Sequence, residues 1–296
     1  MSYHSQRNYR GDADRAAILD LWLAARALGQ GDPWPGLHVL AAALTEPCGA
    51  QLWCDQHDEL VAAALLLEGS VLVWAIRPGA DDEAIEVSVL AWGQSQVDGG
   101  GLFVPVRDDD LRLVQLLERS GFAEEPWQML RMVRGLLDPL TPPSLPAGCT
   151  IRPLNPPHDL AAATALHSKL FAGDRKQISE RKQLMAAPGY HSQLDLIAVS
   201  PQGELVGYCL GMHYPVAAHH HPTPSGWLEL IGVAAPWHGR GLGRALTLAM
   251  VEAMRAEGLS HVLLSVSADN LTARRMFEHC GFQVRHRIRW YVDATG

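Results

Sequence analysis

The sequence predicts a mixed α/β protein built from two similar domains in tandem. The first observation is that one order of strands and helices occurs twice, with matching residues at matching places. The second is a stretch with four prolines, residues 138–148, between the two runs. Proline interrupts both helix and ladder hydrogen bonding, so this stretch is expected to be a stiff linker. We therefore predict a first domain over 1–137, a linker over 138–148 and a second domain over 149–296.

Composition narrows the class of protein. The 296 residues are 48% hydrophobic and 19% charged, which is an ordinary globular balance with enough apolar material for two cores. The net charge is −8, so neither nucleic acid nor a membrane surface is an expected partner. Five scattered cysteines without a Cys-x-x-Cys pair favour reduced thiols. With a polar N-terminus and no long apolar run, these features predict a cytoplasmic protein.

The first half alternates apolar runs with turn residues. Acidic Asp12 and Asp14 precede an amphipathic run, as at a helix N-terminus, and Gly29–Pro35 ends it. A polar turn at 55–58 separates two apolar stretches that form a hairpin. The predicted elements are a strand at 7–10, helices at 16–28 and 37–44, hairpin strands at 51–54 and 59–67, a strand at 71–76, a helix at 83–93, a strand at 102–106, a helix at 109–119 and a strand at 127–133.

The second half has the same order after the linker. The predicted elements are a strand from 151, helices at 159–171 and 175–185, hairpin strands at 194–200 and 204–212, a strand at 228–233, a helix at 244–257, a strand at 261–266, a helix at 271–279 and a strand at 287–292. Four pairs of residues anchor the two halves at offsets of 145, 145, 158 and 160: Asp14 and Asp159, Glu59 and Glu204, Pro78 and Pro236, Gly121 and Gly281. The change from 145 to 158 predicts a 13-residue insertion near 215–226.

The most informative stretch is the glycine-rich turn after the strand that ends at Val233. Gly239, Gly241 and Gly243 alternate there, immediately before a helix. A helix N-terminus offers free N–H groups and the positive end of a dipole, so a phosphate or pyrophosphate is the natural guest. The spacing fits neither a dinucleotide fingerprint nor a P-loop. A turn that only allows close packing of helix and strand is the alternative.

This turn, His238-Gly239-Arg240-Gly241-Leu242-Gly243, resembles the acetyl-CoA loop of the GNAT family of N-acetyltransferases, Gln/Arg-x-x-Gly-x-Gly/Ala. The family's second marker is matched by Asn270-x-x-Ala273-x-x-Met276-Phe277-x-x-x-Gly281-Phe282. His238 replaces the usual Gln or Arg, and the usual proline stands at 236 instead of 235. The resemblance implies two tandem GNAT-like domains, each a mixed, mostly antiparallel twisted sheet flanked by helices. It also implies acetyl-CoA as cosubstrate and no metal.

The resemblance further implies a set of cofactor-binding residues. The loop would donate N–H groups to the pyrophosphate, with charge added by Arg240 or Arg244. The central strand would splay from its neighbour, and its backbone would pair with the pantetheine arm, the Val233 N–H polarising the thioester carbonyl. The full set is Ile231, Gly232, Val233, His238, Gly239, Arg240, Gly241, Leu242, Gly243, Arg244, Asn270 and Phe277.

Glu229 is the candidate catalytic residue. It lies four residues before Val233, where many members of this family carry a base that acts directly or through water. A carboxylate between Leu228 and Leu230 on a central strand is unusual, and burial would suit it to accept a proton near neutrality. Two alternatives stay open, because Glu229 could only bind the substrate ammonium or could pair with an arginine.

Phe277 stands where the family often has a tyrosine that protonates the leaving thiolate, and phenylalanine cannot do so. Tyr208, Tyr214 and Tyr291 are candidates for that role. Cys280 is expected to be a buried, idle thiol because it lies in a helix-ending turn without an Asp/His frame. Nothing in the pattern ranks the three tyrosines.

Two charged segments are expected to be solvated. His219–His221, with His213 nearby, lacks the spacing that converges ligands on a metal, although the segment would border the acceptor site. The basic run 175–182, which includes Arg181, is expected to be an exposed helix face.

The first half lacks the glycine loop. Gly79-Ala80-Asp81-Asp82-Glu83 stands in its place, and acids at a helix N-terminus repel a pyrophosphate. We therefore expect no pyrophosphate site there, so this half would be a scaffold or a wall of the acceptor cleft. The arrangement resembles tandem members of the family with a degenerate N-terminal half.

The sequence thus predicts an acetyl-CoA-dependent N-acetyltransferase that acts on a primary amine of a small molecule by direct attack. The alternative is a non-catalytic acyl-CoA-binding sensor or scaffold, which Phe277 and His238 would favour.

Overall fold

The structure is a computed structural model that describes residues 5–27, 39–40, 43–44, 49–80, 82–97, 99, 101–137, 139, 142, 144–171, 178–186, 189–213 and 224–293. Half of the predicted helix at 37–44 and most of the segment 215–226 lie outside these residues. The chain folds into two compact units. Of the described residues, unit 1 contains those up to Leu130 and those from His286 onward, and unit 2 contains those from Arg131 to Arg285.

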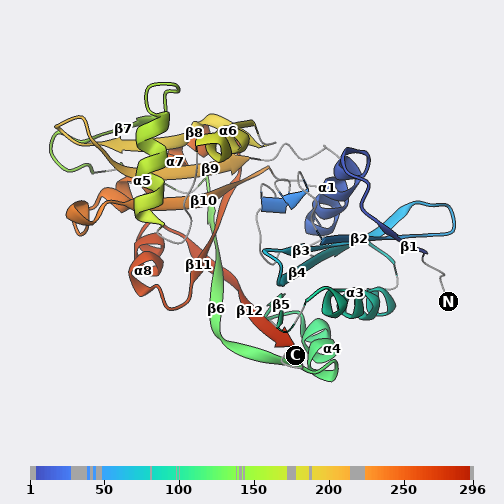
Figure 1. The fold of residues 1–296 in the computed structure, drawn as a ribbon. Helices are drawn as coiled ribbons and strands as arrows, with labels where there is room; N and C mark the ends of the chain where they lie inside the picture. The colour runs from blue at the N-terminus through green and yellow to red at the C-terminus, as the bar shows by residue number, and fades with distance from the viewer. Residues whose placement is uncertain are drawn as a thin grey trace. The chain divides into compact units, whose positions relative to one another are not determined.

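Unit 1 is a sheet with helices packed on it (Figure 1). Its elements are β1 (Ser5–Asn8), α1 (Asp12–Ala27), β2 (Gly49–Cys54), β3 (Leu60–Leu67), β4 (Val71–Ile76), α3 (Asp82–Gln96), β5 (Leu102–Arg107), α4 (Leu111–Arg119) and the first part of β6 (Phe122–Gly135). The strands follow the order β1-β2-β3-β4-β5, and all neighbours are antiparallel except β4 and β5. Apolar side chains of β3, β4 and β5 pack with α3 and α4 into a buried core.

Unit 2 has the same plan. Its elements are β7 (Thr150–Pro153), α5 (Leu160–Leu170), α6 (Ile178–Ala186), β8 (Tyr190–Val199), β9 (Leu205–His213), β10 (Ser225–Val233), the 3₁₀ turn η1 (Ala235–Trp237), α7 (Leu242–Ala256), β11 (His261–Ser267), α8 (Leu271–His279) and the start of β12 (Gln283–Asp293). The order is β7-β8-β9-β10-β11, with only β10 and β11 parallel. The predicted mixed, mostly antiparallel sheet and its order of elements are confirmed.

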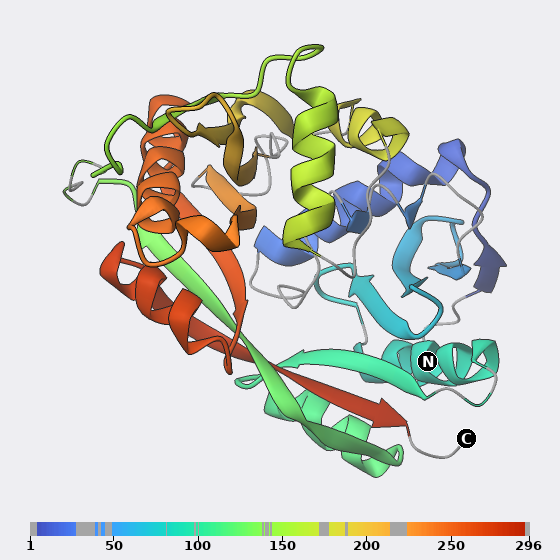
Figure 2. The same ribbon diagram turned by 60° about the vertical axis from the view of Figure 1, so that its left-hand side comes forward.

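Helices α5 and α7 cover opposite faces of the sheet of unit 2. A Cβ atom at Gly211 would lie 2.5 Å from the Met250 sulfur of α7, and one at Gly232 would lie 2.8 Å from Leu170 of α5. Figure 2 shows α7, in orange, and α5, in yellow-green, on the two sides of these strands. Glycine at both positions therefore lets a helix approach the sheet closely.

Each unit is completed by a strand from the other sequence repeat. In unit 1, Ile288–Asp293 of β12 pair antiparallel with Leu102–Arg107 of β5. In unit 2, β6 is the neighbour of β11, and the Leu136 N–H donates to the Ser260 carbonyl at 2.9 Å. The repeat pattern places β6 with the first half and β12 with the second, so the sequence did not predict this exchange of final strands.

The internal repeat is visible in hydrogen bonds. The Arg7 guanidinium donates two hydrogen bonds to Asp14, at 2.7 and 2.8 Å. The Arg152 guanidinium likewise donates two to Asp159, at 2.5 and 3.0 Å. Each pair lies 145 residues from its counterpart. The caps of α4 and α8 also correspond, because Asp110 accepts from the Leu113 N–H and Asn270 accepts from the Ala273 N–H. Helices α4 and α8 therefore correspond at an offset of 160 residues.

The predicted insertion before β10 is in the right connection, but its length of 13 residues is wrong. The Arg77 N–H donates to the Val61 carbonyl, and the Ala234 N–H donates to the Val206 carbonyl, so Arg77 corresponds to Ala234. Pro78 therefore corresponds to residue 235, and Pro236 lies one residue beyond that position. A second extra residue lies inside β10. In unit 1 the neighbouring pairs are Leu66 with Leu72 and Leu65 with Val73, whereas in unit 2 they are Gly211 with Leu228 and Leu210 with Leu230. Glu229 is the additional residue, which leaves 11 for the connection before β10.

Candidate active site

The glycine turn runs from η1 into α7 and needs glycine at two positions for its backbone. Gly239 and Gly241 have φ of 71° and 81°, in the left-handed region that disfavours other residues. A Cβ atom at either would meet nothing within 4 Å, so conformation is the constraint there. Gly243 differs, because its Cβ would lie 3.0 Å from the Met276 sulfur on α8. The turn therefore serves both a particular backbone path and close helix packing.

Two cations flank the open N-terminus of α7. Gly241 is the N-cap, and within the described residues no side chain caps the first turn. Arg240 and Arg244 are exposed on either side of this cap, and the Arg240 guanidinium lies 5.1 Å from the centre of the Trp237 ring. Leu242 is buried and offers only its backbone. N–H groups with a positive dipole end and two arginines form a favourable setting for a pyrophosphate.

The two parallel strands beside this turn diverge. β10 pairs with β11 only from Ser225 to Leu228, whose partner is Leu264. Beyond that point β10 pairs with β9 alone as far as Val233, among the strands that the structure describes. Glu229–Val233 are half-buried, although the strand lies inside the sheet. The divergence opens one edge of β10 over these residues, as the family resemblance implies.

The backbone of Val233 faces that open edge. The N–H of Ala234 points the other way and donates to the Val206 carbonyl on β9 at 2.8 Å. Backbone groups of successive strand residues alternate in direction, so those of Val233 and Ile231 point toward the side where β11 has diverged. By the family resemblance these groups would pair with the pantetheine arm, which stays a prediction.

His238 makes a contact that the sequence did not predict. Its Nε2 lies 2.7 Å from the Val233 carbonyl oxygen, so the ring can donate to it as the Nε2–H tautomer. The contact fastens the turn to the end of β10. It also occupies the carbonyl of Val233 at the open edge and leaves the N–H of the same residue for a ligand. The histidine in place of the usual Gln or Arg therefore has a role inside the turn.

Glu229 lies at the β-bulge of β10, where it is the extra residue opposite β9. It is half-buried and immediately follows the last residue that pairs with β11. Bulges redirect a side chain and are frequent beside active sites. The corresponding strand of unit 1, β4, pairs with β3 without a bulge. Of these two strands, β10 is therefore the one that carries a carboxylate at a bulge. The assignment of Glu229 as a base stays a prediction.

The second family marker has a structural use in α8. Asn270 is exposed and caps this helix by accepting from the Ala273 N–H at 3.1 Å. The ring of Phe277 is 3% exposed and packs edge to face on Phe282, with centroids 5.8 Å apart. Cofactor contacts of both residues stay predictions.

Arg181 was predicted to lie on a solvated face, and this prediction is wrong, because the residue is 5% exposed. Its guanidinium donates to both oxygens of Asp195 at 2.6 Å and also to the Tyr208 hydroxyl. Asp195 is completely buried and accepts a further bond from the Tyr190 hydroxyl at 2.7 Å. The sequence missed this network because Arg181 stands in a basic run that is typical of a surface helix.

The candidate tyrosines differ in their surroundings. Tyr208 is buried, and burial raises the pKa of its phenol, so it stays protonated. Tyr291 belongs to unit 1, where its hydroxyl donates to Glu124 at 3.4 Å. Tyr214 lies outside the described residues. Cys280 is buried as expected, and burial raises the pKa of its thiol, which makes it a poor nucleophile.

The histidine prediction can be followed only in part. His219–His221 lie outside the described residues. His213 lies beside His191, with ring centroids 5.4 Å apart, and burial together with that neighbour lowers the pKa of His213. Over the described part of the chain, no three His, Cys, Asp or Glu side chains gather as metal ligands would, and no helix there is long and apolar enough to span a membrane.

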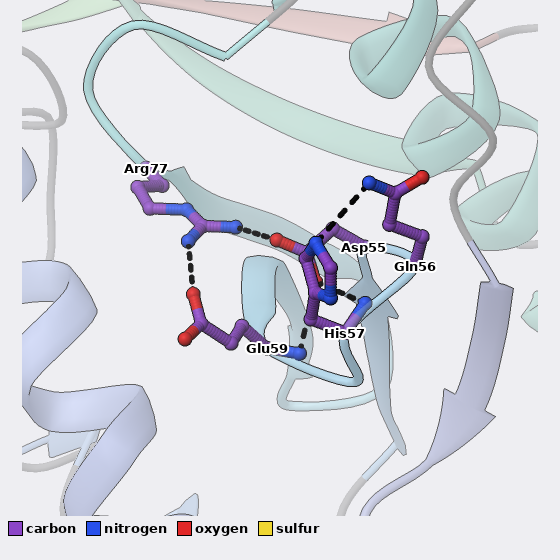
Figure 3. Close-up of polar contacts among 5 residues, drawn as sticks. All are labelled: Asp55, Gln56, His57, Glu59 and Arg77. Carbon is purple, nitrogen blue, oxygen red and sulfur yellow. Dashed lines mark hydrogen bonds and ion pairs between the residues drawn. The ribbon is translucent and has the colours of Figure 1, made fainter.

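In unit 1, ion pairs surround the end of β4, just before the position that corresponds to the glycine turn. Figure 3 shows Arg77, the counterpart of Ala234, bonded to Asp55 at 2.9 Å and to Glu59 at 3.0 Å. The N–H groups of His57 and Glu59 also donate to Asp55, whereas Ser200 accepts the corresponding bonds in unit 2. Further along, the buried Glu86 of α3 is held by Arg112 of α4 at 2.5 and 2.8 Å. Unit 1 thus has ion pairs at places where unit 2 has none of the corresponding residues: Arg77 stands at the position of Ala234, and Asp55 at that of Ser200.

Known proteins are similar to this chain in sequence and in fold. Residues 164–282 match the model of the Acetyltransferase (GNAT) family. A mycothiol acetyltransferase of Thermobispora bispora is 34% identical over 95% of both chains, and one of Kocuria rhizophila is 29% identical over 80% of both. A GCN5-related N-acetyltransferase from Sphaerobacter thermophilus has a TM-score of 0.69 at 23% identity, covering 98% of this chain and 95% of its own. A tandem GNAT protein from the clavulanic acid biosynthesis pathway has a TM-score of 0.71 at 17% identity, covering 98% of both.

The match in sequence extends over nearly the whole chain and includes the glycine turn and the Asn270–Phe282 marker. The chain therefore belongs to the GNAT family of acetyltransferases.

Proposed function

We propose that this protein transfers the acetyl group of acetyl-CoA to a primary amine of a small molecule, at a site in unit 2. One observation carries the proposal: the glycine turn, the open edge of β10 and the bulge at Glu229 follow one another within 16 residues of chain. An anion site, a row of backbone groups and a carboxylate are the features that direct attack of an amine on a thioester requires.

In the proposed mechanism, each group has one task. The first turn of α7, with Arg240 and Arg244, binds the pyrophosphate. The N–H of Val233 donates to the thioester carbonyl and stabilises the oxyanion that forms during attack. Glu229 removes the proton of the acceptor ammonium, directly or through water, because only the neutral amine is a nucleophile. The oxyanion then collapses, which breaks the C–S bond and releases CoA as a thiolate, and Phe277 has no proton to give to that thiolate.

The acceptor is proposed from the relatives. Mycothiol acetyltransferases align along most of the chain, so an amine of the mycothiol type is the first acceptor to test. Other small primary amines form the panel against which it is compared. The half-buried Glu229 supports an amine acceptor in general, since a carboxylate can first bind an ammonium group and then take its proton.

We also propose that the domain division given by the linker at 138–148 separates an active repeat from one without a pyrophosphate site. Support comes from α3, where Glu83 and Glu86 stand near the helix start and pair with Arg119 and Arg112. These carboxylates interact with the positive end of the α3 dipole, and their negative charge opposes the binding of a pyrophosphate.

The decisive experiment measures acetyl-CoA binding by calorimetry and CoA release with the amine panel, for wild type and Glu229→Gln. We expect wild type to release CoA with an amine, and Glu229→Gln to bind acetyl-CoA normally while losing about 100-fold or more in kcat. Glu204→Gln, at an exposed turn of the same unit, is the matched control and should keep full activity.

Two results would contradict the proposal in different ways. Binding of acetyl-CoA without release of CoA for any amine would favour the non-catalytic sensor. Full activity in Glu229→Gln would leave acetyl transfer in place but remove Glu229 as the base.

A further inference from the structure

We propose that Arg131, on the strand β6 that comes from the first repeat, is a positioning residue for the active site of unit 2. It fixes the point at which β10 and β11 diverge, and it thereby places the open edge of β10. The effect on catalysis rests on the acetyl transfer proposed above, whereas the effect on the two strands does not.

Arg131 contacts both diverging strands. Its side chain is 2% exposed, and its guanidinium carbon lies 4.3 Å from the centre of the Trp227 ring on β10. A guanidinium nitrogen also donates to the Ser265 hydroxyl on β11 at 2.5 Å. A buried cation over an aromatic ring and a charge-assisted hydrogen bond are both strong contacts. Arg131 therefore connects β10 to β11 through side chains.

These contacts lie where the two strands separate. The last parallel pair is Leu228 with Leu264. Trp227 precedes that pair on β10, and Ser265 follows it on β11, so the Arg131 contacts lie on both sides of the last pair. Glu229 follows it on β10 at the bulge. Because the pairing of β10 with β11 stops at Leu228, the side-chain connection through Arg131 limits how far the strands can move apart.

The position of this connection matters for the reaction more than for cofactor affinity. The pyrophosphate would bind at α7, which begins nine residues after Val233. The thioester would lie near Val233, and the amine near Glu229. A shift of about 1 Å between reacting groups can cost about 100-fold in rate. Loosening the strands should therefore lower kcat and leave acetyl-CoA affinity nearly unchanged.

This arrangement gives the first repeat a direct part in the proposed site. It supplies a strand to the sheet of unit 2 together with a buried arginine, which a scaffold attached only through a linker would not do.

The first test is hydrogen exchange on the full chain, which needs no substrate. We expect Arg131→Met to speed amide exchange about tenfold or more in 229–233 and 265–267 and to leave α7 unchanged. Arg134→Met is the matched control, because Arg134 is also on β6, is 5% exposed and donates to the Pro139 carbonyl at 3.0 Å. It should leave exchange in 229–233 unchanged.

The second test is kinetic. We expect Arg131→Met and Ser265→Ala to lower kcat, by about tenfold and about threefold, with the dissociation constant of acetyl-CoA within about twofold of wild type. The double variant should lose no more than Arg131→Met, since both remove one connection. Arg131→Lys, which keeps the charge, should recover part of the loss.

Unchanged exchange in 229–233 for both Arg131→Met and Ser265→Ala would overturn the inference, and so would exchange that rises equally in α7. If Arg131→Met does not fold, Ser265→Ala and Arg131→Lys decide by the same two measurements. An inactive wild type would contradict the proposed function, and the exchange result would still decide the role of Arg131.

Discussion

The Nε2 atom of His238 lies 2.7 Å from the carbonyl oxygen of Val233, and this contact closes the glycine turn onto the strand before it. This carbonyl faces the edge of β10 that β11 leaves open. Because the His238 ring occupies the carbonyl oxygen, that oxygen is no longer a free hydrogen-bond acceptor at this edge. The N–H of Val233 is then the polar backbone group that this residue presents at the open edge.

Substitution of His238 tests this role. We expect His238→Ala to weaken acetyl-CoA binding about five- to tenfold, because one hydrogen bond of about 1 kcal/mol no longer holds the turn. His238→Gln keeps a side-chain N–H donor and should stay within about twofold of wild type. Calorimetric titration with acetyl-CoA provides the measurement. Equal loss in both variants would show that the imidazole itself contacts the cofactor.

Substitution of Gly241 tests the backbone conformation of the glycine turn, because an added Cβ atom would not clash with any neighbour. Its φ is 81° and a Cβ atom would meet nothing within 4 Å, so Gly241→Ala introduces backbone strain alone, about 1 to 2 kcal/mol. We expect about 10-fold weaker acetyl-CoA binding and a melting temperature lowered by about 2 to 4 °C for each kcal/mol of strain. Gly203→Ala, in an exposed hairpin turn with φ of 82°, is the matched control and should bind acetyl-CoA normally. Equal binding by Gly241→Ala and wild type would contradict the pyrophosphate assignment.

Local signals in the sequence were sufficient to predict the helices, the strands and the glycine turn. Helix α8 was predicted with its observed bounds, because Asn270 caps its start and Gly281, with φ of 84°, follows its end. The periodic apolar runs likewise predicted both ends of each strand to within five residues. Such features depend on a few neighbouring residues, so one sequence is enough to read them.

Pairing between distant strands could not be read in this way. Nothing near β6 or β12 distinguishes a partner in the same repeat from one in the other, because each repeat offers the same edge strand. The bulge at Glu229 was likewise hidden, since its effect on the offset was merged with the shifted proline. Arg181 was misassigned because its partner Asp195 lies 14 residues away on another element.

The buried ion pair of Arg181 and Asp195 gives a prediction on stability. Asp195→Asn removes the countercharge of the buried Arg181 side chain, and we expect a loss of about 3 to 5 kcal/mol in the free energy of unfolding. The double variant Arg181→Met with Asp195→Leu should lose less, because no unpaired charge is then buried. Denaturant unfolding followed by circular dichroism provides the comparison. A double variant less stable than Asp195→Asn would show that packing, and not charge, dominates here.

The pairs Arg7–Asp14 and Arg152–Asp159 predict the acid limit of stability, one in each unit. The hydrogen bonds from Arg7 and Arg152 hold the pKa of Asp14 and that of Asp159 below the ordinary value. A carboxyl group whose pKa is lowered by folding stabilises the protein above the unfolded pKa, about 3.9. This contribution is lost as the pH falls through the lower folded pKa.

We therefore expect Asp14→Asn and Asp159→Asn to be less stable than wild type at pH 7 and to differ less from it below pH 3. Arg7 is 21% exposed and Arg152 is 43% exposed, so water screens the second pair more. The expected losses at pH 7 are about 2 kcal/mol for Asp14→Asn and about 1 kcal/mol for Asp159→Asn. Thermal unfolding between pH 2.5 and 7 checks both the sign and the order. A deficit that stays constant over this range would show that the carboxylates stabilise by shape and hydrogen bonding, independent of their charge.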